Sequence, residues 1–302
     1  MGWKRLIVVG SALAGLLLAG VGTRAQAPAP APAPGGAPPA GRQGGGPGGG
    51  GPFAGQTPIN AMIVTGGCCH DYTGQSKVLM DTLNAVMPIN WTVVQGMTAL
   101  PEGRLPLYEN ANWARGIDIV IHNECWANGD LPAQVVQNIA NAPVPRMFLH
   151  CSFHSYRVMT NDGWRELMGG TSRRHTRAHN IAVKWVEGDP ITAGLPPFVT
   201  PIDELYVIEK EWAPFKALAT AVSPEEGQPT FPLVWTHEHR GQRVFATTLG
   251  HGNETFHTNQ FKELVTRGFR WALRKEPIAL PPPAQPARAG GAAGAGRGGG
   301  AR

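Results

Sequence analysis

Histidine, cysteine and glutamate recur just after apolar, strand-like runs of this sequence. The runs lie at 117–121, 146–149 and 243–249, and the residues that follow them are His122, Glu124, Cys125, His150, Cys151, His154 and His251. Open α/β sheets place their chemistry at the carboxyl ends of parallel strands, where the following loops meet. We therefore expect Glu124, His150, Cys151, His154 and His251 to line one cleft, together with His70 from an earlier loop.

These side chains suit proton transfer. Imidazoles titrate near neutral pH, so they can act as general acid and general base in one reaction. We assign these roles first to His251 and His154, with His150 beside them. Glu124 would orient an imidazole, accept a proton or ligate a metal.

A metal centre is the other interpretation of the same residues. Its candidate ligands are His70, His122, His150 and His251, and imidazole, thiolate and carboxylate groups all suit a divalent metal such as zinc. The chain contains neither a His-Glu-x-x-His nor a Cys-x-x-Cys spacing. The prediction therefore rests on position alone, and both interpretations stay open.

Cys151 occupies the place of a nucleophile at a tight turn after a buried strand. A thiolate needs a lowered pKa, which a helix N-terminus and the nearby His154 would provide. The alternatives are a buried structural cysteine and a disulfide to Cys125, which would end the thiolate hypothesis. Cys68 and Cys69 are adjacent, and a bridge between neighbours is strained and rare.

Alternating strands and helices must position these residues. Strands are expected at 60–65, 91–94, 117–121 and 146–149, and helices at 75–87, after an N-cap at Asp130, and at 162–168. The second half is richer in strands, at 181–186, 204–208, 217–221, 233–236 and 244–248, before a closing helix at 261–273. This order predicts a flavodoxin-like α/β fold, with a mostly parallel sheet, helices on both faces and extra antiparallel strands at one edge.

The two ends of the chain lie outside this fold. Lys4 and Arg5 precede an uncharged run and the small-residue site Ala25-Gln26-Ala27, which predicts a signal peptide over 1–27 and a periplasmic or secreted protein. The run is shorter than the roughly 20 apolar residues of a membrane span, so no stable span is expected after cleavage. Residues 28–57 and 279–302 are rich in Pro, Ala and Gly and are expected to be disordered. One domain is expected over 58–278.

The basic composition does not indicate a nucleic-acid partner. Seven of the 26 Lys and Arg residues lie in the two ends, which leaves 19 against 21 Asp and Glu in the foldable part. A nucleic-acid binder concentrates positive charge on its folded domain. We therefore expect none, and a homo-oligomer is compatible with the sequence.

Four segments of the chain resemble the ThuA-like (trehalose utilisation) family over nearly all of 58–278. They are Gly66-Gly67 with His70-Asp71, the strand that runs into His150, the stretches 189–196 and 203–206, and the stretch 241–251. The resemblance implies the fold of class I glutamine amidotransferases and a role in sugar metabolism. Cys151 lacks the flanking glycines of an amidotransferase nucleophile, and the chain has no His-Pro-Glu segment of that type. Glutamine amidotransferase activity is therefore not expected.

The resemblance and the polar residues together suggest an exported protein of carbohydrate metabolism. It would act on a sugar or keto-sugar (glycoside) by hydrolysis, elimination or isomerisation, with acid/base or metal-assisted chemistry. The alternative is a non-catalytic carbohydrate- or metal-binding envelope module. The residues expected to contact the sugar are His70, Asp71, Trp126, Tyr156, Arg173 and Arg174. For the two aromatic residues, the alternative is a packing role as loop anchors.

Overall fold

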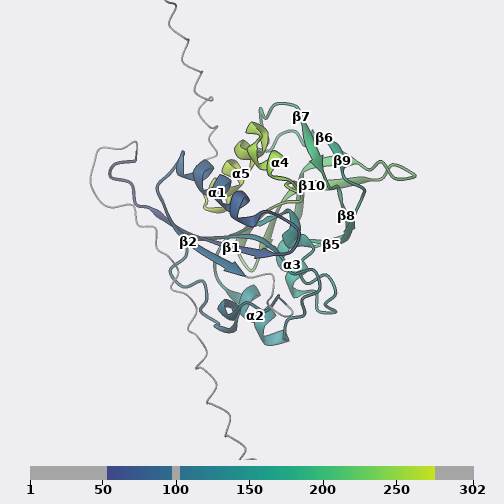
Figure 1. Cartoon of the computed structure of the whole chain (residues 1–302). Coiled ribbons are helices and arrows are strands. Elements are labelled where there is room, and N and C mark those ends of the chain that lie inside the picture. Colours follow the sequence, from purple (N-terminus) through teal and green to yellow (C-terminus); the bar gives the residue numbers. More distant parts are fainter. Residues whose placement is uncertain (1–52, 97–102, 276–302) are drawn as a thin grey trace, which may run out of the picture. The chain divides into compact units, whose positions relative to one another are not determined.

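A computed structural model describes residues 53–96 and 103–275 (Figure 1). The predicted signal peptide, the tail, most of the linker at 28–57 and the last residues of the domain predicted for 58–278 lie outside these ranges. Among the described residues, no helix has the length and apolar character needed to cross a membrane.

A nine-stranded sheet forms the centre of the fold, in the order β2-β1-β3-β4-β11-β10-β9-β6-β7. Its parallel strands are β1 (Ile59–Gly67), β2 (Ile89–Gly96), β3 (Ile119–Cys125), β4 (Arg146–Leu149) and β11 (Gln242–Thr247). The antiparallel strands that extend it are β10 (Thr230–His239), β9 (Phe215–Val222), β6 (His179–Trp185) and β7 (Phe198–Asp203). Strands β5 (Gly170–His175) and β8 (Tyr206–Glu211) pair separately. The predicted α/β fold with added antiparallel strands is confirmed.

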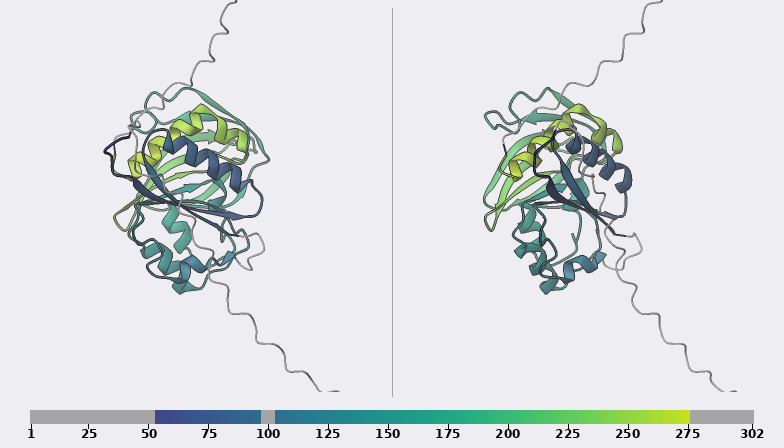
Figure 2. Two further views of the ribbon diagram at one scale, coloured as in Figure 1. Left: turned by 60° about the vertical axis from the view of Figure 1, so that its left-hand side comes forward. Right: turned by 90° about the vertical axis from the view of Figure 1, so that its left-hand side faces the viewer.

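Helices cover both faces of the sheet (Figure 2). On one face lie α1 (Tyr72–Asn84), α4 (Asn253–His257) and α5 (Asn259–Ala272), and on the other lie α2 (Ala133–Asn141) and α3 (Gly163–Met168). Side chains of β3 point alternately to the two faces of the sheet. Ile119 and Ile121 pack in the core beneath α1 and α5, and Val120 packs in the core beneath α2 and α3.

Strand β3 is longer than the sequence predicted, and this moves two of the predicted site residues. It continues to Cys125 because its last residues still pair with β1, with His122 opposite Val64 and Glu124 opposite Gly66. His122 and Glu124 therefore continue the face that Val120 begins, and both are fully buried within the sheet layer.

Glycines allow β1 to end in contact with its neighbours. Gly66 and Gly67 have φ values of 116° and 100°, which side chains rarely tolerate. A Cβ on Gly67 would overlap the carbonyl oxygen of Cys125, and a Cβ on Gly66 would overlap that of Gly96. Without side chains at Gly66 and Gly67, the end of β1 can lie directly against the ends of β2 and β3.

All four predicted helices start at other residues than predicted, and two of these differences have a clear physical reason. Helix α1 begins at Tyr72, three residues early, because the Asp71 side chain accepts the N–H of Gly74 at 2.9 Å and caps the helix. The expected cap at Asp130 is wrong, since α2 begins at Ala133 after Pro132. Pro132 sets the start because its ring is compatible with the first turn only.

Candidate functional site

Three histidines meet at the carboxyl edge of the sheet. His70, His150 and His251 lie in the loops that follow the parallel strands β1, β4 and β11. The ring of His70 is 5.0 Å from each of the other two rings, and those two are 5.6 Å apart, between centroids. Each ring has one nitrogen that could ligate a metal, and these three nitrogens lie within 4.8 Å of one another. We call this group the histidine cluster.

Backbone carbonyls fix the protonation pattern of two of these rings. His150 Nδ1 donates to the Thr248 oxygen at 2.7 Å, and His70 Nδ1 donates to the His251 oxygen at 2.9 Å. A carbonyl oxygen only accepts, so each Nδ1 carries a hydrogen and the neutral rings keep a lone pair on Nε2. At His150 the Tyr206 hydroxyl lies 3.2 Å from that Nε2.

Glu204 places one carboxylate against three imidazoles. Its oxygens lie 3.4 Å from His251 Nδ1, 3.5 Å from His150 Nε2 and 3.5 Å from His175 Nε2. Burial alone would raise the pKa of Glu204, but its contacts with His150 and His251 outweigh burial and hold the pKa well below its usual value. Glu204 is therefore ionised across the neutral pH range.

The environment drives the pKa values of two neighbouring histidines apart. The contact with Glu204 raises the pKa of His251 above its ordinary value, against the effect of burial. Burial, followed by the charges of His150 and His251, lowers the pKa of His70 to about 4. Near neutral pH, His251 is thus the better proton donor and His70 a neutral acceptor, 5.0 Å away between ring centroids.

Asp203 holds the loop that carries His251. This fully buried carboxylate accepts the N–H groups of Gly250 at 3.0 Å and His251 at 3.1 Å, and the hydroxyl of Thr255 at 2.9 Å. It also accepts the N–H of Glu204 at 2.8 Å. One side chain therefore fixes both members of the Glu204–His251 pair.

Sequence reasoning assigned no site role to Asp203, Glu204, His175 or Tyr206. The signal was present, because the segment 203–206 was one of those that resemble the ThuA-like family. It was missed because the segment joins β7 to β8, on the antiparallel side of the fold, whereas the prediction considered parallel strand ends.

His154 lies behind the cluster, separated from His150 by Tyr206. Its ring stacks on Tyr206 at 3.9 Å between centroids, and its Nε2 lies 3.2 Å from Ser172 Oγ. Burial, with added effects of the His150 and His175 charges, lowers the pKa of His154 to about 3. The buried, neutral ring supports Tyr206 and does not join the three histidines predicted with it.

Glu124 and His122 form a second polar group, within the α2 and α3 layer. Glu124 accepts hydrogen bonds from His122 Nδ1 at 2.8 Å, Tyr108 Oη at 2.8 Å and Trp126 Nε1 at 2.9 Å. Burial lowers the pKa of His122 although Glu124 opposes this. The expectation that they share the cleft is corrected, because β3 runs through both residues and turns them to the other face.

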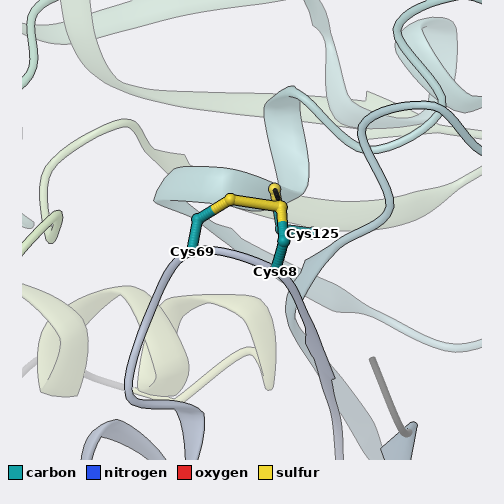
Figure 3. A group of neighbouring side chains, drawn as sticks. All are labelled: Cys68, Cys69 and Cys125. Atoms are coloured by element: carbon teal, nitrogen blue, oxygen red, sulfur yellow. Dashed lines mark hydrogen bonds between the residues drawn. A yellow bond between two sulfur atoms is a disulfide. The ribbon is translucent and has the colours of Figure 1, made fainter. Parts of the chain in front are cut away.

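Cys151 is bonded to Cys125, and Cys68 is bonded to Cys69 (Figure 3 shows three of these residues). In this form Cys151 has no thiolate, so its predicted role as a nucleophile is replaced by the disulfide alternative. The bridge that was expected to be rare, between neighbours, is also present.

The two predicted aromatic contacts serve as anchors. Trp126 is 5% exposed and its indole N–H is taken by Glu124. Tyr156 is fully buried and donates to the Gly103 oxygen at 3.0 Å. Neither ring is open to a sugar in this structure.

The predicted charged contacts also have partners within the chain. Asp71 caps α1 and accepts the Asn253 amide at 2.8 Å. The partners of the two arginines are acidic: Arg173 pairs with Glu209 at 2.6 Å and Arg174 with Glu225 at 2.7 Å. Each of these charged groups therefore has a partner within the chain.

Comparison with known proteins shows the family of the chain. A family model described as ThuA, trehalose utilisation, matches residues 119–272, about half of the chain. The chain belongs to the ThuA family. The match includes His150, Glu204 and His251, and His70 lies outside it.

Solved structures are similar to this chain, and one of them, a ThuA-like protein, shows the same fold. A ThuA-like protein from Bacteroides uniformis is similar with a TM-score of 0.54 at 17% identity, over 77% of this chain and 98% of that one. A β-galactosidase from Rahnella sp. matches with a TM-score of 0.47 at 15% identity, over 74% of this chain and 32% of that one. No curated protein matches the sequence. The ThuA-like fold is thus shared, and the family description relates the chain to carbohydrate metabolism.

Proposed function

We propose that this ThuA family member acts on a sugar or keto-sugar glycoside at the histidine cluster and Glu204. The observation that carries the proposal is the opposed pair of imidazoles: the pKa of His251 is raised by Glu204, and that of His70 is lowered to about 4. Neighbouring groups with divergent pKa values can share acid and base roles at one pH. The family description, trehalose utilisation, supports a sugar as the substrate.

Each residue has a definite task in such a reaction. The neutral His70 would accept a proton from a sugar hydroxyl, or from the carbon beside a ketone. His251, charged while paired with Glu204, would return a proton to the leaving oxygen or to the carbonyl oxygen. The buried His150 and Tyr206 would position Glu204, since His150 Nε2 lies 3.2 Å from the Tyr206 hydroxyl and 3.5 Å from the Glu204 carboxylate.

The same residues fit a divalent metal such as zinc. Three imidazoles offer nitrogens within 4.8 Å of one another, and His70 and His150 donate their other ring N–H to a carbonyl oxygen, the usual support of a ligating histidine. A metal bound there would polarise a carbonyl or activate a water. His70, His150 and His251 would hold it, and Glu204 would orient His251.

The three imidazole nitrogens that lie within reach of one metal ion also favour a second candidate function, a non-catalytic metal-binding module. The two candidates differ in one respect: only the first predicts turnover. Zinc bound at one equivalent, without conversion of any sugar, would decide for the module.

We also propose that the protein is exported. The order of Lys4, Arg5, the apolar run and Ala25-Gln26-Ala27 supports this. The two disulfides support it as well, because disulfides persist mainly in oxidising compartments.

Turnover by the full exported chain tests the function. A panel of disaccharides and their keto derivatives should yield at least one converted substrate. His251→Ala should lower its turnover by about 10²–10⁴-fold, the usual effect of losing an acid/base group. The matched control is His257→Ala, since His257 is an exposed histidine at the end of α4. Equal losses in both variants, or no turnover of the whole panel, would contradict the proposal.

A further inference from the structure

The four cysteines form one contiguous group with an exposed pair and a buried pair. Cys68 and Cys69 are exposed, whereas Cys125 and Cys151 are 3% and 5% exposed. The sulfur atoms of Cys68 and Cys125, which belong to different disulfides, lie 3.8 Å apart (Figure 3). This contact joins the surface disulfide to the interior one.

Backbone geometry fixes this contact. Gly67 pairs with Cys125 in the sheet, and the N–H of Cys68 donates to the Cys125 oxygen at 3.1 Å. The absence of a side chain on Gly67 permits the close approach. On the other side, Tyr72 donates to the Cys68 oxygen at 2.7 Å and packs against Cys125 and Cys151. Cys68 is therefore held against Cys125 from two directions.

We propose that these cysteines form a thiol–disulfide exchange relay. The exposed Cys68–Cys69 disulfide receives two electrons from an external dithiol and passes them to the buried Cys125–Cys151 disulfide. Exchange requires a thiolate that reaches a disulfide sulfur, and accessibility decides which disulfide reacts first. An external dithiol can reach the exposed pair, and Cys68 contacts the buried pair through the sulfur of Cys125.

The relay proceeds in balanced steps. An external thiolate attacks the Cys68–Cys69 bond, and its second thiol completes the reduction, leaving two protein thiols and an oxidised external disulfide. The Cys68 thiolate then attacks Cys125, forming Cys68–Cys125 and releasing the Cys151 thiolate, which takes up a proton. Finally, Cys69 attacks Cys68, re-forms Cys68–Cys69 and releases Cys125 as a thiol. The net change is reduction of the buried disulfide and oxidation of the dithiol.

The relay ends next to the histidine cluster. Cys69 directly precedes His70, and Cys151 directly follows His150. Reduction would free a Cys151 thiol at the turn where sequence analysis expected a nucleophile. The exchange chemistry itself does not depend on the proposed sugar chemistry, so either can fail without the other.

Disulfide mapping of two single variants tests the central step. In Cys69→Ser, the lone Cys68 thiol faces Cys125, so acid-quenched peptide maps should contain a Cys68–Cys125 bridge with a free Cys151. In the matched variant Cys68→Ser, the contacting sulfur is removed, and the Cys125–Cys151 bridge should persist. Absence of a Cys68–Cys125 bridge in Cys69→Ser, with the fold intact by circular dichroism, would overturn the relay.

Reduction rates give an independent test. Dithiothreitol should reduce Cys125–Cys151 at least about tenfold more slowly in a Cys68→Ser, Cys69→Ser double variant than in the wild type, because the attack is no longer intramolecular. Equal rates would overturn the proposal. Two further results would also overturn it. One is that all four cysteines of the wild type react with an alkylating reagent without prior reduction, and the other is that the wild type binds zinc through these sulfurs.

Discussion

Glu204 favours the protonated form of His251. Its carboxylate lies within 3.5 Å of nitrogens of three histidines, His150, His175 and His251. The contact with Glu204 raises the pKa of His251 above its ordinary value. His70 loses affinity for protons, since it is buried beside two other imidazoles. Glu204 thus favours the proton on His251, whereas burial and the neighbouring imidazoles keep His70 neutral near neutral pH.

Replacement of this carboxylate should therefore change the titration of His251. In Glu204→Gln the favourable charge is gone while burial remains, so the pKa of His251 should fall from its raised value. Imidazole NMR signals followed against pH would measure it. In the control Glu226→Gln, which changes an exposed glutamate, the titration should match the wild type. An unchanged pKa in Glu204→Gln would show that another group charges His251.

The same pair makes stability depend on pH. The raised pKa of His251 contributes stability that is fully present below its unfolded value of 6.5 and is lost as pH rises through the folded pKa. The lowered pKa of Glu204 contributes stability present above 4.5 and lost as pH falls through the folded pKa.

The wild type should therefore exceed Glu204→Gln in free energy of unfolding most clearly between pH 4.5 and 6.5. Urea denaturation of both proteins across the pH range would measure this difference. If the difference in free energy of unfolding between the two proteins grew as pH rose above the pKa of His251, the result would contradict this ion pair.

The sequence located most of the histidines correctly because each follows an apolar run that is easily recognised. His70, His150 and His251 belong to loops after strands, and their meeting follows from parallel strand direction. His122 and Glu124 show the limit of that reasoning. Their polarity suggested a loop, but buried hydrogen bonds among His122, Glu124 and Tyr108 allow the strand to continue through them.

At the scale of elements, apolar periodicity identified the parallel strands and the long helices. Strand β4 begins and ends where predicted, at Arg146 and Leu149. Strands β5 and β7 were missed because their sequences give little apolar signal: β5 is Gly-Thr-Ser-Arg-Arg-His, and β7 contains Pro201. These two segments are extended because they pair with β8 and β6, respectively, and not because of their own sequence pattern.

The end of β1 should tolerate no side chain at Gly67. Gly67→Ala combines left-handed backbone strain of about 1 kcal/mol with overpacking of about 1–3 kcal/mol against the Cys125 carbonyl. Gly116→Ala is the matched control, since Gly116 also has a positive φ, of 78°, but open space around it. Denaturant titrations should show the larger loss of stability for Gly67→Ala. Equal losses would mean that β1 does not approach β3 this closely.

At the scale of the whole molecule, two halves of the fold build one site. The parallel half contributes the three histidines through the loops after β1, β4 and β11. The antiparallel half contributes Asp203, the last residue of β7, and Glu204, and Asp203 joins the halves through hydrogen bonds with Gly250 and His251. These contacts of Asp203 could not be predicted from the sequence alone. The residues that it contacts lie 47 and 48 positions away, and no sequence motif links the two segments.

Export is the prediction that concerns the chain as a whole. The mature protein should begin near Pro28, after the small-residue site Ala25-Gln26-Ala27. Amino-terminal sequencing of protein recovered outside the cytoplasm would test this. Recovery of a chain that still begins at Met1 would count against a cleaved signal peptide.

The most direct test of a sugar site at the histidine cluster is an imidazole NMR titration of the whole protein with a disaccharide and its keto derivative. We expect the signals of His70, His150 and His251 to shift together and to saturate with one of these sugars. Those of two reference residues outside the cluster, the buried His122 and the exposed His257, should stay in place. If the sugars leave the three cluster signals unchanged, or shift only His122 or His257, the assignment of sugar chemistry to this cluster is wrong.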